Sequence, residues 1–241
     1  ITNAESLTSI TENEHAVICL FVAVQMLRTN DERTAIRQLN STICAWARRS
    51  GYDPNKDIEN FQELSEEDVK RYSIHVLRTI PGELAKRICE KEWCLLKAGF
   101  GEGFYISDNP VTMYNHFPRP GRGNLGLALK GIEVHFPISP RLCVSFVCPQ
   151  TIAAIRARVK KHLAMIASGA CYPIDMSEPQ SFIDQFDRKI VRELKPENLE
   201  FHNSLQVPQS TRFLYSRSSK FELAKDMLKT NPEFKNPRSY V

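Results

Sequence analysis

Asp108 is the residue whose type and position most strongly suggest chemistry. It stands in residues 105–110, where a short apolar run passes directly into the order Ser-Asp-Asn-Pro. Asp and Asn favour turns because their side chains bond nearby backbone, and Pro fixes the next φ angle. The stretch is therefore either a purely structural turn or a strand end that presents the Asp108 carboxylate to a cleft, as a base or a ligand.

A second acidic residue lies on a predicted strand. Glu133 and His135 flank Val134 in a segment that alternates apolar and polar residues, the pattern of a half-buried β-strand. Asp108 followed by Glu133-x-His135 loosely resembles a metal-dependent nuclease core, with His in place of the usual Lys. Two acids at this separation around a hairpin also arise by chance, so nuclease chemistry is one interpretation among several.

Several common catalytic motifs are missing from the chain. GxSxG, HExxH and GxxxxGK[ST] are all absent, which removes support for the usual hydrolase, zincin and P-loop classes. The six histidines show no i, i+3 or i, i+4 pairing with one another. Each is expected to be a surface or packing residue, although His202 beside Asn203 is worth attention. We expect no metal site, and the cofactor stays unknown.

Positive charge is concentrated in one part of the chain. The formal net charge is +4, yet residues 119–162 hold eight basic residues against one acidic residue, a surplus of 7. Such a stretch indicates a polyanionic partner, such as nucleic acid or an acidic protein, or else a solvated face balanced by acids elsewhere in the fold. The basic residues are Arg119, Arg122, Lys130, Arg141, Arg156, Arg158, Lys160 and Lys161.

The seven cysteines and the hydropathy pattern indicate a cytoplasmic protein. The cysteines include no CxxC, and we expect small buried hydrophobes without disulfides in a reducing compartment. The longest apolar run, residues 16–27, is too short to cross a bilayer, so no membrane association is expected. The chain opens on Ile1, and we expect a segment to precede it.

Local signals predict four helices in the first third of the chain. Thr11 with Glu14 and Ser65 with Asp68 each have capping-box spacing. Asp31 is expected to cap a helix that ends near residue 49. Pro81 should end the third helix near residue 79 and begin a fourth that runs to about residue 90.

Strand patterns follow, and helices then return. Residues 93–97, 104–107, 132–138 and 142–147 are predicted strands with mainly antiparallel pairing. Helices are predicted at 151–167, 180–194 and 221–228, a short helix capped by Asn203 through residue 209, and a short strand at 213–216. Helices segregated around a small central sheet define an α+β fold. We expect a single domain, with helical (1–92), sheet (93–148) and mainly helical (149–241) parts.

Four stretches, in order, resemble the domain of unknown function 4238 family over nearly the whole chain. They are Phe-Val-Ala-Val-Gln-Met-Leu-Arg-Thr at 21–29, Tyr-Ile-Ser-Asp-Asn-Pro-Val at 105–111, Phe-Pro-Ile-Ser-Pro-Arg-Leu at 136–142, and Asn-Ser-Leu-Gln at 203–206 with Arg-Phe-Leu-Tyr-Ser at 212–216. The chain departs from the family pattern at Ile106, where Thr is usual, and it lacks the family's opening His-x-x-Pro segment.

The resemblance implies a set of site residues but no activity. Gln25 with Arg28, and Asn203 with Gln206, are i, i+3 pairs that share a helix face. Polar groups among apolar neighbours are costly to bury unless they are hydrogen-bonded. They either tie their helices to the Asp108 turn or line a pocket with it.

The leading hypothesis is a hydrolase that acts on nucleic acid or another phosphate-rich substrate. In it Asp108 is a base or metal ligand, and Arg28 and Arg141 stabilise negative charge. The substrate is oriented by side-chain amides, those of Gln25, Asn109, Asn203 and Gln206. The alternative is a non-catalytic module that binds nucleic acid or an acidic protein through the basic stretch.

Overall fold

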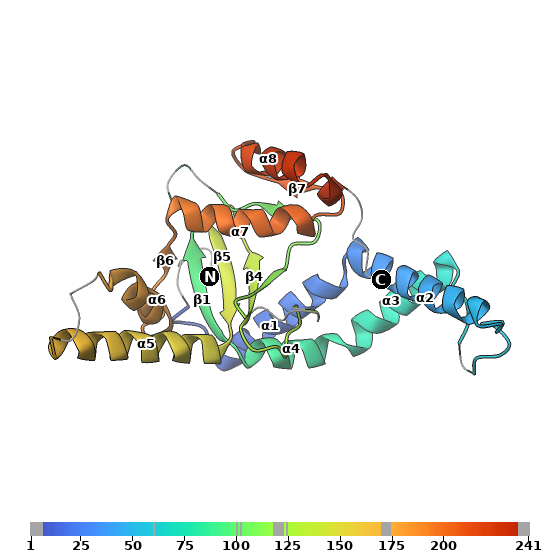
Figure 1. The fold of residues 1–241 in the computed structure, drawn as a ribbon, viewed down its shortest axis with the longest axis horizontal. Helices are drawn as coiled ribbons and strands as arrows, with labels where there is room; N and C mark the ends of the chain where they lie inside the picture. Colours follow the sequence, from blue (N-terminus) through green and yellow to red (C-terminus); the bar gives the residue numbers. More distant parts are fainter. Residues whose placement is uncertain are drawn as a thin grey trace.

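The computed structural model describes residues 7–59, 61–99, 101, 103–117, 123, 125–169 and 175–235 of the 241-residue chain. Its fold class is α+β, as predicted, with a mixed central sheet between two groups of helices (Figure 1). No helix in the described part of the chain is long and apolar enough to cross a membrane.

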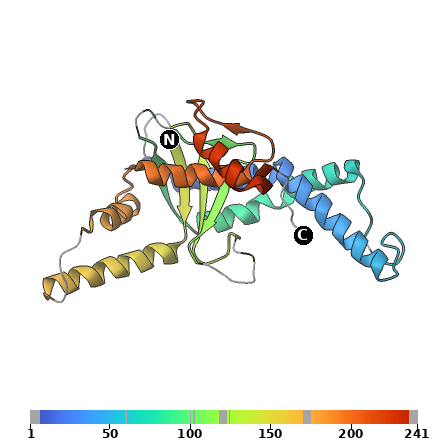
Figure 2. The same cartoon turned by 45° about the horizontal axis from the view of Figure 1, so that its top comes forward.

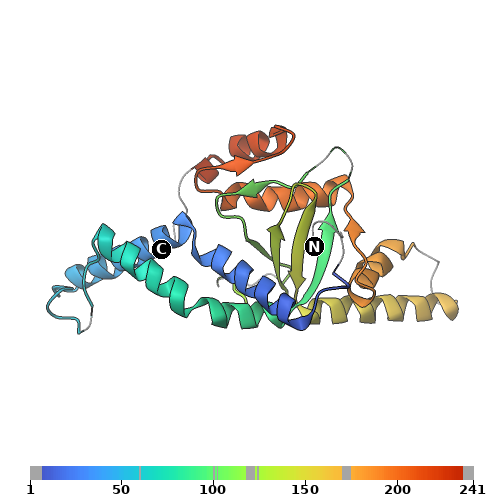
Figure 3. The ribbon, with the colours of Figure 1, turned by 180° about the vertical axis from the view of Figure 1, so that it is seen from behind.

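The first group of helices is defined by local signals. These helices are α1 (Glu12–Leu27), α2 (Asn30–Arg49), α3 (Glu66–Thr79) and α4 (Pro81–Cys89). The capping boxes at Thr11 and Ser65 are both present, and Pro81 occupies the first turn of α4. Helix α1 crosses one face of the sheet beside α4, whereas α2 and much of α3 extend away from it (Figure 3).

The larger sheet has the strand order β3-β4-β5-β1-β6 among the described residues. Its strands are β1 (Glu92–Lys97), β3 (Thr112–Asn115), β4 (Ile132–Pro137), β5 (Leu142–Val147) and β6 (Arg192–Glu193). Neighbouring strands are antiparallel except for β6, which pairs in parallel with β1 at one edge. A smaller sheet joins β2 (Ile106–Ser107) to β7 (Leu214–Tyr215).

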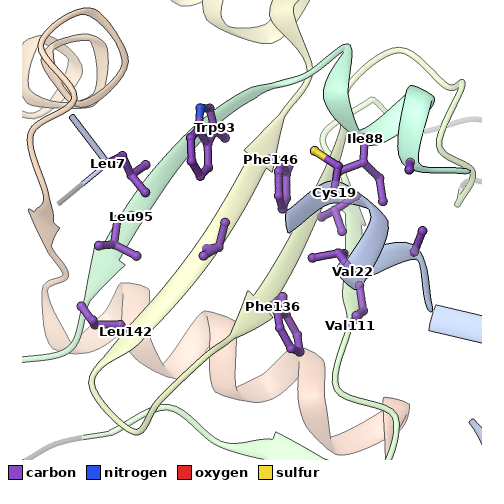
Figure 4. Close-up of a cluster of buried hydrophobic side chains, with 14 residues drawn as sticks. Leu7, Cys19, Val22, Ile88, Trp93, Leu95, Val111, Phe136, Leu142 and Phe146 are labelled. Carbon is purple, nitrogen blue, oxygen red and sulfur yellow. The ribbon is translucent and has the colours of Figure 1, made fainter. Parts of the chain in front are cut away.

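The two faces of the larger sheet differ in chemistry. The face toward α1 and α4 is an apolar core that includes Trp93, Leu95, Val134 and Phe146 (Figure 4). Because successive side chains of a strand alternate between faces, the intervening residues of β4 and β5 point the other way. That second face mixes apolar residues with Glu133, His135 and Ser145, which are all buried.

The second face is covered by the C-terminal part of the chain. Helices α5 (Pro149–Ala167), α6 (Ser177–Asp187) and α7 (Pro196–Gln209) lie around it, and α7 crosses the strands (Figures 1 and 2). Helix α8 (Glu222–Thr230) and a short 3₁₀ turn, η1 (Pro232–Lys235), follow the small sheet. Part of α5 projects beyond the sheet, opposite to α2.

Three local predictions are wrong, and one strand was not predicted. Asn203 does not cap a helix but lies inside α7, because Pro196 begins that helix two turns earlier. The predicted helix at 180–194 ends at Asp187, and its last residues include β6. Thr29 rather than Asp31 caps α2. Strand β3 was not predicted, because it is short and lies among turn-forming residues.

Candidate functional site

Helix α7 holds the Ser-Asp-Asn-Pro turn through the side-chain amide of Gln206. Its Oε1 accepts hydrogen bonds from the Ser107 amide (3.0 Å) and hydroxyl (2.8 Å). Its Nε2 donates to the Pro110 carbonyl (2.9 Å). All three groups are buried, so the glutamine replaces the partners that a neighbouring strand would supply.

Asn203, one turn earlier, repeats this arrangement. Its Oδ1 accepts from the Tyr105 amide (2.7 Å) and its Nδ2 donates to the Gly103 carbonyl (3.0 Å). Asn203 and Gln206 therefore tie α7 to the backbone on both sides of β2. Of the two roles that the sequence left open, these bonds belong to the structural one, in which the amides tie their helix to the Asp108 turn. A role of Asn203 and Gln206 in substrate binding stays a prediction.

The carboxylate of Asp108 follows β2, as the sequence predicted, and it holds the segment that leads to β7. It accepts from the Thr211 amide (2.9 Å) and from the Thr211 hydroxyl (2.6 Å). Burial alone raises the pKa of Asp108, but these hydrogen bonds outweigh that effect and the pKa lies below its ordinary value. Asn109 is also engaged, since its Nδ2 donates to Asp31 at the start of α2 (2.8 Å).

Gln25 and Arg28 meet Asp108 at a hollow of about 710 Å³, which we call the turn hollow. Arg28 Nε donates to Gln25 Oε1 (2.7 Å), and Arg212 contributes a second guanidinium to the lining. Among the described residues, Arg28 and Asp108 share this hollow without forming an ion pair. Arg141 lies in the β4–β5 turn, outside the lining of the turn hollow.

A second cavity, of about 590 Å³, lies over the second face of the larger sheet, the one away from α1 and α4, between the strands and helices α5–α7. We call it the sheet cavity. Its floor includes Glu133 and His135 of β4 and Ser145 of β5. His135 and Ser145 are cross-strand partners, and His135 Nδ1 lies 2.8 Å from Ser145 Oγ.

Glu133 and His116 form a hydrogen-bonded pair in the sheet cavity. His116 Nε2 lies 2.9 Å from Glu133 Oε1, and the histidine side chain is 44% exposed against 10% for the glutamate. His135 Nε2 lies 3.4 Å from the other carboxylate oxygen, which is ion-pair distance without hydrogen-bond alignment. The glutamate thus stands between two imidazoles.

The two histidines shift the pKa of Glu133, and Glu133 in turn shifts that of His116. Burial alone raises the pKa of Glu133, but the contacts to His116 and His135 outweigh it and lower the pKa to about 2. The same carboxylate raises the pKa of His116 above its ordinary value, against the smaller opposing effect of burial. A buried carboxylate that stays ionised beside a half-exposed imidazole can orient that imidazole and stabilise its protonated form.

Other polar atoms in the sheet cavity have no hydrogen-bond partner within the described protein. They are Thr151 Oγ1 of α5, Gln185 Oε1 of α6 and His202 Nδ1 of α7. Gln185 is only 2% exposed. Burial is the main reason that the pKa of His202 falls to about 3, so its ring is neutral. Buried polar atoms of folded proteins are nearly always bonded, so these three point to water or a ligand in the cavity.

Two arginines give the sheet cavity a positive rim. Arg158 of α5 is exposed, whereas Arg192 of β6 pairs with Glu178 (2.8 Å). Of the basic stretch, Lys160 and Lys161 also lie exposed on α5, and Arg156 pairs with Asp187. Arg119 and Arg122 lie outside the described residues.

Sequence reasoning chose none of the sheet-cavity residues as site residues. Glu133 and His135 were considered only as a weak nuclease signal, His116 as a surface or packing residue, and His202 was noted only for its place beside Asn203. The one sequence signal for Glu133 and His135 is the alternation of polar and apolar residues along β4. That alternation does not say whether the polar face meets solvent or a cavity.

The cysteines of the described part are free thiols, as predicted. Cys171 lies outside the described residues. Cys19 and Cys89, which are distant in sequence, lie close together with His15.

The fold and the sheet cavity define an α+β protein with a buried glutamate–histidine cluster over one face of a mixed sheet. Residues 1–220 match the family described as protein of unknown function (DUF4238), and the chain belongs to that family. The resemblance inferred from the four stretches is therefore confirmed. No curated protein and no solved structure matches the chain.

Proposed function

We propose that the chain is a hydrolase whose active site is the sheet cavity and whose substrate is a small phosphate-bearing molecule. The observation that carries this proposal is the hydrogen bond between His116 and the buried, ionised Glu133. A half-exposed imidazole held by a buried carboxylate is the arrangement of a general base and the group that orients it. Free thiols suit the reducing cytoplasm as the place of action.

His116 has the right chemistry to activate water. When Nε2–H donates to Glu133, the lone pair of Nδ1 is available to take a proton. The raised pKa of His116 makes it a stronger base than a free imidazole and lets it return the proton to a leaving group near neutral pH. The ionised Glu133 stabilises the imidazolium that forms between these steps.

The remaining lining of the sheet cavity suits an anionic molecule with a flat apolar part. Arg158 and Arg192 are guanidinium groups at the rim and can bind phosphate oxygens. Tyr114 and Phe201 present aromatic rings, with centroids 4.9 Å apart, on which a planar ring can stack. A volume of about 590 Å³ falls in the usual range for small-molecule sites. A nucleotide fits this description.

Substitution of the pair tests the proposal. Glu133→Gln and His116→Gln should each lower phosphate release from a panel of nucleoside mono-, di- and triphosphates by about 10²–10⁴-fold, the usual contribution of a general base. His75→Gln, on the exposed side of α3, is the matched control and should keep full activity. The proposal is wrong if the wild-type chain neither hydrolyses nor is thermally stabilised by any member of the panel, or if His116→Gln keeps its activity.

Helix α5 supports a second candidate function, non-catalytic binding of a nucleic acid. Arg158, Lys160 and Lys161 are exposed on this helix, which carries no acidic residue. Charge on a surface helix binds phosphates without reading bases. Replacing these three residues and Arg156 by Gln should weaken binding to single-stranded DNA. The slope of log affinity against log salt concentration should become shallower by about 0.7 for each phosphate that is no longer neutralised.

The two functions predict opposite results. If the chain is a hydrolase, Glu133→Gln and His116→Gln lower phosphate release and leave DNA retention unchanged. If it is a binding module, the α5 substitutions remove DNA retention, whereas Glu133→Gln and His116→Gln leave it unchanged.

A further inference from the structure

Two helices bring three soft ligand atoms together on the α1 side of the sheet, away from the sheet cavity. His15 and Cys19 are one turn apart on α1, and Cys89 is the last residue of α4. The ring nitrogen and the two sulfur atoms all lie within 4.8 Å of one another. Thiolate and imidazole together are the ligand set that zinc prefers in proteins.

The spacing already matches a tetrahedral ion. Zn–S bonds of about 2.3 Å and a Zn–N bond of about 2.0–2.1 Å place neighbouring sulfur and nitrogen ligands about 3.6 Å apart. His15 Nε2 lies 3.5 Å from Cys19 Sγ. We propose that His15, Cys19 and Cys89 bind a zinc ion that clamps α1 to α4, with water or another small ligand in the fourth position.

The surroundings fix two of the ligands in place. Cys19 is fully buried in the apolar core, beside Ile88 of α4 and near Val22 (Figure 4). The His15 ring stacks on the Trp93 indole with centroids 4.4 Å apart, which limits its rotation. Ligands whose orientation is set before the ion arrives lose little conformational freedom when they bind it.

Charge balance also favours a divalent ion here. Binding of Zn²⁺ would deprotonate the two thiols and leave two thiolates whose charges cancel that of the ion. Burying a neutral cluster costs much less free energy than burying an isolated charge. Cys89 and His15 are only partly buried, which gives the ion an approach.

Cobalt substitution tests the site directly. The reduced, chelator-treated full chain is titrated with Co²⁺, and thiolate-to-cobalt charge-transfer absorption and tetrahedral d–d bands are expected, with Zn²⁺ abolishing both. Cys19→Ser and Cys89→Ser should each diminish the charge-transfer band and weaken zinc binding by more than about 100-fold, beyond the effect typical of supporting residues. Cys44→Ser, at a buried cysteine bonded to Asn40 on α2, is the matched control and should bind normally.

His15→Phe separates a ligand role from a packing role. Phenylalanine keeps an aromatic ring on Trp93 but offers no ligand atom, so folding should persist while zinc affinity falls. Zinc should also raise the melting temperature of the wild-type chain and not that of the Cys variants, since it binds only the folded state. The proposal is wrong if the reduced wild-type chain gives no thiolate–cobalt band, or if the band persists undiminished in both Cys variants. It is equally wrong if Cys19 and Cys89 form a disulfide that reductant cannot open.

Discussion

Gln206 of α7 accepts two hydrogen bonds from Ser107 with a single oxygen atom. The Ser107 backbone amide lies 3.0 Å from this oxygen and the Ser107 hydroxyl 2.8 Å. Its amide nitrogen donates to Pro110 in the same turn. Through one side chain, a helix late in the sequence fixes the backbone of the turn that bears Asp108.

Gln206→Ala should therefore destabilise the protein. It leaves the Ser107 amide and the Pro110 carbonyl buried without partners, each at about 1–3 kcal/mol. We expect the free energy of unfolding, measured by urea denaturation, to fall by roughly 3 kcal/mol. Gln209→Ala, in the last turn of the same helix, is the control and should change it by less than about 0.5 kcal/mol.

Arg28→Ala distinguishes a site from a structural tie at the turn hollow. Arg28 is exposed and its described hydrogen bond is to Gln25, so we expect little change in melting temperature. Asp108→Asn, by contrast, weakens charged hydrogen bonds to Thr211 and should cost about 1 kcal/mol. A melting temperature several degrees lower for Arg28→Ala would show that Arg28 is structural.

Stability should fall in acid because His202 resists protonation in the fold. Its pKa is about 3 in the folded protein, below the ordinary 6.5 that applies when the chain is unfolded. Between these values the unfolded chain binds more protons, so the free energy of unfolding decreases as pH falls, with a slope of up to about 1.4 kcal/mol per pH unit. His202→Phe should flatten this slope between pH 6.5 and 4. An unchanged slope would place the sensitivity elsewhere.

The Glu133–His116 pair acts on stability at both ends of the pH range. The pKa of Glu133, lowered to about 2, adds stability that is present above its unfolded value and lost as pH falls toward 2. The raised pKa of His116 adds stability that is full below pH 6.5 and lost as pH rises through the folded value. His116→Gln should remove the decline on the alkaline side in unfolding measurements from about pH 6 to 9.

Gly131 sets the turn before β4 and should not tolerate a side chain. Its φ is +85°, and an added Cβ would meet Phe117 and approach Asn115 Oδ1 at 2.7 Å. Gly131→Ala should cost more than about 1 kcal/mol through backbone strain and steric overlap. Gly82→Ala in α4, where a Cβ meets nothing within 4 Å, should be neutral or stabilising in the same thermal melts.

Elements with strong local signals could be predicted from the sequence. The capping boxes at Thr11 and Ser65 and the break at Pro81 depend on residues within a few positions, so the helix ends follow from local chemistry. The apolar β5 and alternating β4 were equally clear. Strands β3 and β6 were not, because edge strands of four and two residues are stabilised by their neighbours rather than by their own composition.

The candidate sites depend on residues that are distant in sequence, which local patterns cannot bring together. Asparagine is a common helix-capping residue, and only the position of Pro196 places Asn203 inside α7. There its side chain accepts a hydrogen bond from the Tyr105 amide. The pairing of His116 with Glu133 depends on the β3–β4 hairpin, and the roof over them comes from α5–α7. Cys19 and Cys89 meet because α1 packs on α4.

The alternation along β4 has a consequence for how this family can change. Glu133 and His135 face the sheet cavity, while Val134 and Phe136 pack against α1. A shift of one residue in pairing would drive a carboxylate into the apolar core, so the register is strongly enforced. Yet replacing alternate residues alters only one side of the sheet. A relative can thus exchange the polar side chains that face the sheet cavity and still inherit the packing that sustains the fold, and a designer can do the same.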